Sequence, residues 1–277
     1  MDKDMRTRNG TRTALSSLLV LAGGLSLAAQ GCGGSGPGES VLPGVEALVF
    51  VQRAYELGDG SHDIGGGTMQ VIDYLRYTPG GGVMVLSPPT PDGTLTSLTD
   101  DFTGVDIAGL DLSFDAEEVV FSMRHADDDH YHLYVARIDG TTVPRQLTFG
   151  DWDDLRPIYA PGDRVAFITN QPYTAMGMRR DEYERGEVAQ MAVISLGGGE
   201  PTLCAQNLSH SADPFLLSNG QIGFSRWEHL GSRNDVKVFR MNPDCTGMEA
   251  LAGEFNRDFN SLVQVTEIEP GVFVGIG

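Results

Sequence analysis

A short β run that ends on or near phenylalanine recurs along the chain and constrains its fold more than any other feature. It occurs as ALVFV (47–51), EVVFSMR (118–124), RVAFITN (164–170), QIGFSRW (221–227) and GVFVGIG (271–277). The Phe residues stand at 50, 121, 167, 224 and 273, so successive spacings are 71, 46, 57 and 49 residues. Self-similarity at such a period indicates a repeat architecture.

Each repeat has the same order of turns and strands. A turn such as APGDR (160–164) precedes the Phe run, and Pro-Gly is a strong turn signal. An alternating strand, a second turn and a closing strand with Leu follow, as in HLYVARI (132–138) and QLT (146–148). Four short antiparallel strands at this period predict an all-β fold, a β-propeller of four-stranded blades. Four to five blades are visible between residues 45 and 277.

The fifth run, GVFVGIG, is the last segment of the sequence and leaves two alternatives for the ring. Either this strand closes the propeller against the N-terminal strand, or the sequence is the front part of a longer chain and the ring is incomplete. We favour the incomplete ring. An unclosed propeller leaves a sheet edge and an apolar blade face exposed, which favours partners.

Several stretches resemble known propeller families. PIYAPGDRVAFITN and RIDGTTVPRQLTFGDWDDLRP are similar to the TolB-type (WD40-like) repeat, and the resemblance covers roughly residues 45–277. DLSFDAEEVVFSMR, GQIGFSRWEH and MNPDCTGMEAL resemble the propeller region of the alpha subunit of hydrazine synthase. That family carries c-type haem beside its propeller. The present sequence has no CxxCH motif, so the resemblance implies architecture and no haem.

The pattern of residues at the N-terminus predicts a targeting segment. Basic residues precede an apolar stretch at 14–29, which is short for a membrane span and fits a signal peptide over residues 1–31. AAQGC resembles a bacterial lipoprotein cleavage site, with Cys32 as the lipidated residue, and 32–44 form a Gly/Ser/Pro tether. The alternative is ordinary signal cleavage near Ala29. We expect an exported protein, in the periplasm or anchored by lipid at the outer membrane of a Gram-negative-type bacterium.

The formal net charge of −19 limits the kinds of partner. Such an acidic chain repels nucleic acid and anionic headgroups, so we exclude nucleic-acid binding. Basic partners and divalent cations remain, and we expect an envelope or periplasmic protein as partner. A divalent cation is the one cofactor that the residues leave open.

Two cysteines besides Cys32 bear on the fold. Cys204 and Cys245 are 41 residues apart, close to one repeat, so neighbouring blades would bring them together. An exported compartment permits a disulfide. The alternative is two unpaired cysteines.

The richest candidate metal site is RHADDDHYH (124–132). Imidazole and carboxylate ligands suit Zn²⁺, and carboxylates alone suit Ca²⁺. The alternative is a solvated hairpin whose charges keep a sheet edge soluble. The candidate ligands are His125, His130, His132, Asp127 and Asp129.

Two further stretches are candidates for a ligand or partner surface: DWDD (151–154) and SRWEH (225–229). The alternative for both is hydrogen bonding and packing between blades. The candidate residues are Asp151, Asp153, Asp154, Arg226, Trp227 and His229.

Motifs for enzyme chemistry are absent from the sequence. It has neither the G-x-S-x-G of serine hydrolases nor the H-E-x-x-H of zinc proteases, and we assign no catalytic residue. The sequence therefore favours a binding scaffold in the cell envelope. The alternative is the haem-free propeller part of a redox complex like hydrazine synthase.

Overall fold

The computed structural model describes residues 42, 44–53, 77–172, 187–204, 210–230, 233–253 and 261–277, with the backbone alone at 228–230 and 233–234. The described residues form β-strands and contain no helix. Accordingly, no helix with the length and apolar character to cross a bilayer is present among them.

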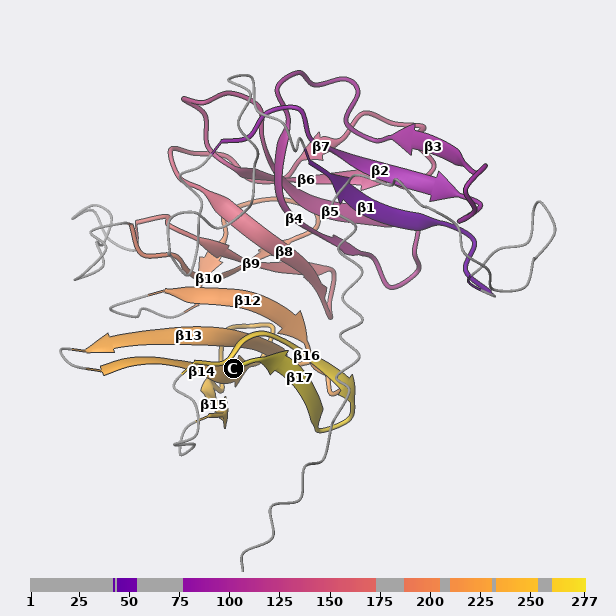
Figure 1. Cartoon of the computed structure of the whole chain (residues 1–277). Helices are drawn as coiled ribbons and strands as arrows, with labels where there is room; N and C mark the ends of the chain where they lie inside the picture. The colour runs from indigo at the N-terminus through magenta and orange to yellow at the C-terminus, as the bar shows by residue number, and fades with distance from the viewer. Residues whose placement is uncertain are drawn as a thin grey trace, which may run out of the picture.

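The strands form five antiparallel sheets, which we call blades 1 to 5 in chain order (Figure 1). Blade 1 contains β1 (Leu48–Gln52), β2 (Gly82–Ser87) and β3 (Thr94–Ser97). Blade 2 contains β4 (Asp106–Leu112), β5 (Glu118–Arg124), β6 (His132–Arg137) and β7 (Arg145–Gln146). Blade 3 contains β8 (Asp154–Ala160), β9 (Arg164–Thr169), β10 (Gln190–Ser195) and β11 (Thr202–Leu203). Blade 4 contains β12 (Ser211–Leu216), β13 (Ile222–Leu230), β14 (Arg233–Met241) and β15 (Glu249–Ala252), and blade 5 contains β16 (Val263–Glu269) and β17 (Val272–Ile276).

The first strand of each of blades 2 to 5 lies innermost. β4 packs against β8, β8 against β12, and β12 against β16, so these four strands line the inner side of an arc. Within each sheet the strands then follow in chain order toward the outside. This arrangement confirms the predicted propeller of four-stranded blades.

The repeated Phe residues hold the blades together. Phe121, Phe167 and Phe224 lie in the second strand of their blades and are almost completely buried. Each packs in a cluster with apolar residues of the preceding blade: Phe121 with Val83, Phe167 with Leu133, and Phe224 with Met191. The recurrence in the sequence therefore reflects the packing of one blade on the next.

Each inner strand contains a β-bulge at the same place in the repeat. The pairing register shifts inside β4, β8, β12 and β16, and one residue in each bulge has a positive φ angle. The bulges of neighbouring blades meet, since a Cβ added to Gly109 would lie 3.1 Å from the Cα of Arg156. A bulge redirects one side chain out of the regular alternation. The four bulge residues are Gly109, Arg156, Asp213 and Gln264.

The arc of blades is open. Blade 1 has three described strands and blade 5 has two, and no sheet among the described residues joins β17 to β1. Figure 1 shows the two end blades on either side of the opening. The free face of blade 5 is apolar, with Ile268 58% and Ile276 57% exposed. This is the incomplete ring that the sequence favoured.

A disulfide joins blades 3 and 4 at their outer side. Cys204 directly follows β11, and Cys245 lies in the turn between β14 and β15. Their sulfur atoms are bonded and their Cα atoms are 4.8 Å apart. One repeat of separation along the chain thus places the two cysteines on adjacent blades.

Candidate functional site

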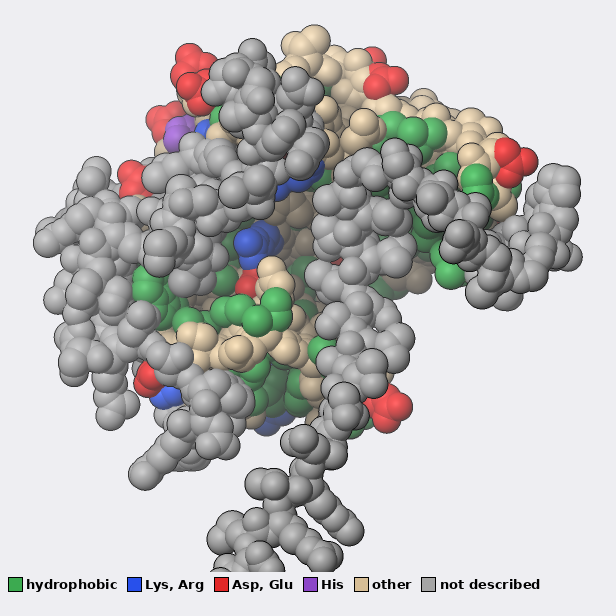
Figure 2. Space-filling view, in the orientation of Figure 1, with side chains coloured by type: hydrophobic (Ala, Val, Ile, Leu, Met, Phe, Trp, Pro, Cys, Tyr) green, Lys and Arg blue, Asp and Glu red, His purple; other side chains and the backbone are tan. Residues whose placement is uncertain are grey.

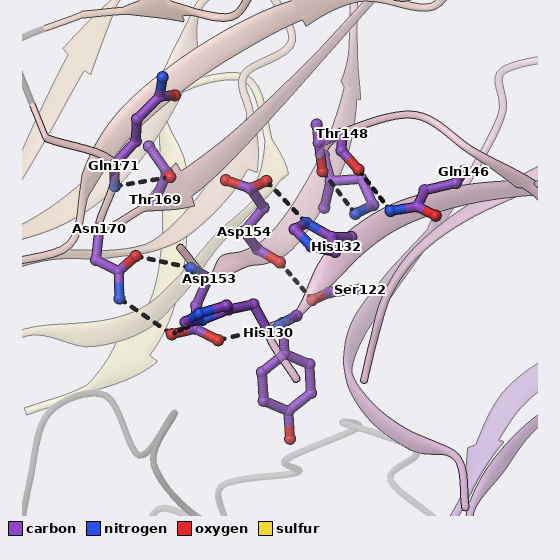
Figure 3. A network of polar contacts seen from close by, with 12 residues as sticks. Ser122, His130, His132, Gln146, Thr148, Asp153, Asp154, Thr169, Asn170 and Gln171 are labelled. Atoms are coloured by element: carbon purple, nitrogen blue, oxygen red, sulfur yellow. Dashed lines mark hydrogen bonds and ion pairs between the residues drawn. The ribbon is translucent and has the colours of Figure 1, made fainter. Parts of the chain in front are cut away.

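Asp153 joins blade 2 to blade 3 (Figure 3). Its Oδ1 accepts a hydrogen bond from the backbone N–H of Tyr131 at 3.0 Å, and its Oδ2 accepts one from Nδ2 of Asn170, also at 3.0 Å. The Asn170 Oδ1 in turn accepts from the backbone N–H of Asp153 at 2.7 Å. This carboxylate is therefore used for structure, since both of its oxygens have protein partners.

Asp154 lies deeper in the same interface and is fully buried. Its Oδ2 is 3.7 Å from Nδ1 of His132, and its backbone oxygen accepts a hydrogen bond from Oγ of Ser122 at 2.5 Å. Neither carboxylate oxygen has a partner at full hydrogen-bond geometry among the described residues. Burial raises the pKa of Asp154, while the neighbouring His132, Thr169 and Thr148 act in the opposite direction.

The burial of Asp154 gives a testable dependence of stability on pH. The ordinary pKa of an aspartic acid is 3.8, and folding raises the pKa of Asp154 above this value. Its protonation therefore stabilises the fold fully at a pH below 3.8, and this contribution is lost as the pH rises through the pKa of the folded state. We expect the melting temperature of Asp154→Asn to improve relative to wild type as the pH rises from about 4 to 7. Asp151→Asn, at an exposed position of the same stretch, is the control and should follow wild type at every pH. A difference between wild type and Asp154→Asn that stays constant with pH would contradict this.

A second group of charged residues lies beside the inner strands. Asp106 is buried, and its Oδ2 accepts hydrogen bonds from the backbone N–H of Thr78 at 2.8 Å and from Oη of Tyr131 at 2.7 Å. Nη2 of Arg53 donates to Oδ1 of Asp106 at 3.2 Å and to the backbone oxygen of Ile107 at 2.9 Å. The Arg53 side chain is nonetheless 45% exposed, whereas the side chain of its partner Asp106 is 2% exposed.

Two bulge residues continue this group into blades 3 and 4. Arg156 and Asp213 form an ion pair through Nη1 and Oδ1, and Oδ2 of Asp213 accepts from the backbone N–H of Gln264 at 3.1 Å. The Arg156 side chain is 34% exposed. Burial lowers the pKa of Arg156, and the positive charge of Arg53 acts in the same direction.

We call Arg53, Asp106, Arg156 and Asp213 the axial site. Figure 2 shows basic and acidic side chains together in the hollow in the middle of this face, while acidic side chains stand at the outer parts. The axial site pairs two guanidinium groups with two carboxylates, and the side chains of Arg53 and Arg156 are both partly exposed. Such a site suits an anionic group, because arginine binds carboxylate and phosphate through paired donors.

The axial site was missed at the level of sequence, although a signal for it exists. Arg156 and Asp213 are 57 residues apart, which is the same spacing as Phe167 and Phe224. Aligning the repeats on Phe therefore places the two residues at one position of neighbouring blades. An alignment of the inner strands, rather than a search for local motifs, would have found them.

The residues of the predicted DWDD surface are not all at the surface. Asp151 is exposed, whereas Asp153 and Asp154 are buried between blades 2 and 3. The latter two make the contacts of the alternative interpretation, hydrogen bonding between blades.

The predicted metal ligands do not gather at one point. His125 lies 3.6 Å from Asp129, His130 lies 3.5 Å from Asp153, and His132 faces Asp154. The three imidazoles thus face three different carboxylates. In the described part of the chain, no group of three or more His, Cys, Asp or Glu residues is arranged to hold a metal ion, and Asp127 is exposed on the hairpin.

The SRWEH candidates lie in β13. Trp227 is buried and stacks on His210 with ring centroids 5.7 Å apart, and the Arg226 guanidinium lies 5.0 Å from the centroid of Phe239. Both side chains therefore pack within the blades. The side chain of His229 and the whole of Cys32 are outside the described residues.

Comparison with known proteins shows which solved structures have a similar fold. No protein-family model and no curated protein matches the chain. Among solved structures, Kuenenia stuttgartiensis hydrazine synthase matches with a TM-score of 0.62 and 17% identity, over 80% of this chain and 34% of that chain. Oligogalacturonate lyase from Vibrio parahaemolyticus matches with a TM-score of 0.50 and 13% identity, over 71% of this chain and 53% of that chain. A putative TolB from Agrobacterium tumefaciens has a TM-score of 0.47 and 17% identity, over 62% of this chain and 56% of that chain.

These similarities concern the fold alone. The chain is a β-propeller like hydrazine synthase and oligogalacturonate lyase. It spans about a third of the length of the hydrazine synthase chain and about half of the lyase.

Proposed function

We propose that this protein is a binding scaffold of the cell envelope, exported and anchored by lipid at Cys32, which holds a segment of a partner protein at the axial site. The observation that carries the proposal is the contrast in exposure within the propeller. Asp153 is occupied in joining two blades and Asp154 is buried between them, whereas the side chains of Arg53 and Arg156 are 45% and 34% exposed beside the inner strands. A rigid frame that presents a few accessible charged groups is suited to binding.

Affinity capture from a detergent extract of the envelope tests this function. The purified protein is the bait, and we expect it to retain a partner protein that an Arg156→Gln bait retains at least about tenfold less, because a charge-assisted hydrogen bond is lost. Arg240→Gln is the matched control, since Arg240 pairs with Glu249 on the outer part of blade 4. Wild-type bait that retains nothing above an empty-resin background would contradict the proposal.

A second candidate function is the propeller part of a redox complex like hydrazine synthase. It is favoured by the match over 80% of the chain at a TM-score of 0.62. The same capture experiment separates the two candidates. Retention of a haem protein, seen as a Soret band in the eluate, supports the redox complex, and a haem-free partner supports the scaffold.

A further inference from the structure

Arg124 has buried hydrogen-bond donors that are not satisfied by the described residues. It lies at the end of β5 and is 5% exposed. Its guanidinium carbon is 4.9 Å from the ring centroid of Tyr77 and 4.8 Å from that of Tyr131, so the cation contacts two aromatic rings. Its Nε and Nη2 are buried, and no acceptor among the described residues reaches them. Cation–π contacts offset part of the cost of burying this charge, but they supply no acceptor for the N–H groups.

The two carboxylates of the axial site already have partners. Asp106 accepts from Arg53, Thr78 and Tyr131, and Asp213 is paired with Arg156. Arg124 therefore adds a third guanidinium to an axial site that holds two carboxylates. The three guanidinium groups thus outnumber these two carboxylates, and two buried donors of Arg124 have no acceptor among the described residues.

Arg124 lies beside the axial site. Its guanidinium carbon is 4.8 Å from the ring centroid of Tyr131, whose Oη donates to Oδ2 of Asp106 at 2.7 Å. Nη2 of Arg53 donates to the other oxygen of the same carboxylate at 3.2 Å. The repeat explains this proximity, because Arg53 and Arg124 each stand three residues after a Phe of the repeat and so occupy equivalent positions in blades 1 and 2.

We infer that Arg53, Arg124 and Arg156 bind a carboxylate group carried by the partner segment. This inference rests on the proposed function and adds the chemistry of its ligand. A carboxylate has two acceptor oxygens in a plane, which match paired guanidinium donors. The oxygens would complete the hydrogen bonding of Arg124 and add negative charge where the site lacks it.

The surroundings of the site also specify the rest of the segment. Asp127 and Asp129 lie on the hairpin that directly follows Arg124. The whole chain carries a formal net charge of −19. Long-range attraction therefore favours a basic segment, within which a single carboxylate enters the axial site.

Two peptides that differ only in their carboxylates test the inference. The probes are dansyl-labelled Lys-Lys-Gly-Gly-Glu with a free C-terminus and Lys-Lys-Gly-Gly-Gln with an amidated C-terminus, and binding is followed by anisotropy at low salt. We expect the carboxylate peptide to bind wild type at least about tenfold more tightly than the amide peptide. Arg156→Gln and Arg53→Gln should each remove this preference, and Arg240→Gln should keep it.

Equal binding of the two peptides to wild type, or an undiminished preference in both axial variants with wild-type melting temperatures, overturns the inference. Two variants are used because Arg156 pairs with Asp213 and its loss could affect folding. The result is also distinct from that of the capture experiment. A captured partner without carboxylate preference removes the inference alone, whereas a carboxylate preference without a captured partner removes the proposed protein partner alone.

Discussion

Replacing Phe167 by alanine is expected to lower the free energy of unfolding by about 3–5 kcal/mol. Phe167 has no exposed surface and packs with Val120 and Leu133 of the preceding blade. Truncation removes a large apolar side chain and leaves a cavity between two sheets that cannot close without moving a blade. The midpoint of urea unfolding, followed by circular dichroism, measures the effect.

The control for this change is Phe114→Ala. Phe114 lies in the turn between β4 and β5 and is 69% exposed, so its loss should change stability by no more than about 0.5 kcal/mol. The two substitutions remove the same atoms and differ in burial. Equal destabilisation by both would show that the repeated Phe does not hold the blades together.

Loss of the disulfide is expected to have the second large effect, about 4 kcal/mol. Cys204 and Cys245 close a loop of chain between two blades, with 41 residues of separation. In the chain-entropy account, the cross-link stabilises the fold by restricting the unfolded chain. The double variant Cys204→Ala/Cys245→Ala should therefore melt at a lower temperature than the oxidised wild type.

Reductant provides the internal control for the disulfide. Dithiothreitol should lower the melting temperature of wild type toward that of the double variant and leave the double variant unchanged. The same melting temperature for wild type with and without reductant, under conditions where its thiols become reactive to a maleimide, would contradict a stabilising role for the bond.

The frame of the protein was predictable because it repeats. The repeats place turn residues, such as Pro161 and Gly162, and buried aromatic residues, such as Phe121 and Phe224, at recurring positions. Each repeat therefore predicts the same local structure independently of the others. The placement of Cys204 and Cys245 on neighbouring blades followed from the same period. Packing between blades needs only the residue type and the period, and both are visible in the sequence.

The axial site was not predictable in the same way, because it depends on a departure from regular strand alternation. Alternation assigns side chains to two faces of a sheet, and a bulge breaks that assignment. Arg156 and Asp213 are redirected by their bulges and meet across two blades. Closeness in sequence, in turn, suggested a metal site that the structure does not form. His125, His130 and His132 are close in sequence but face separate carboxylates.

At the bulge position the side chain varies between blades, while the strand pairing that stabilises each blade stays the same. Four successive blades place glycine, arginine, aspartate and glutamine there, although all four share a positive φ angle. The surrounding strands keep their pairing whichever of these side chains is present. Gly109 is the constrained member, because the close approach of Arg156 leaves little space for a Cβ atom. Arg156, Asp213 and Gln264 carry side chains at this position, so we expect substitutions there to change which ligand the propeller binds while the pairing of the strands is kept.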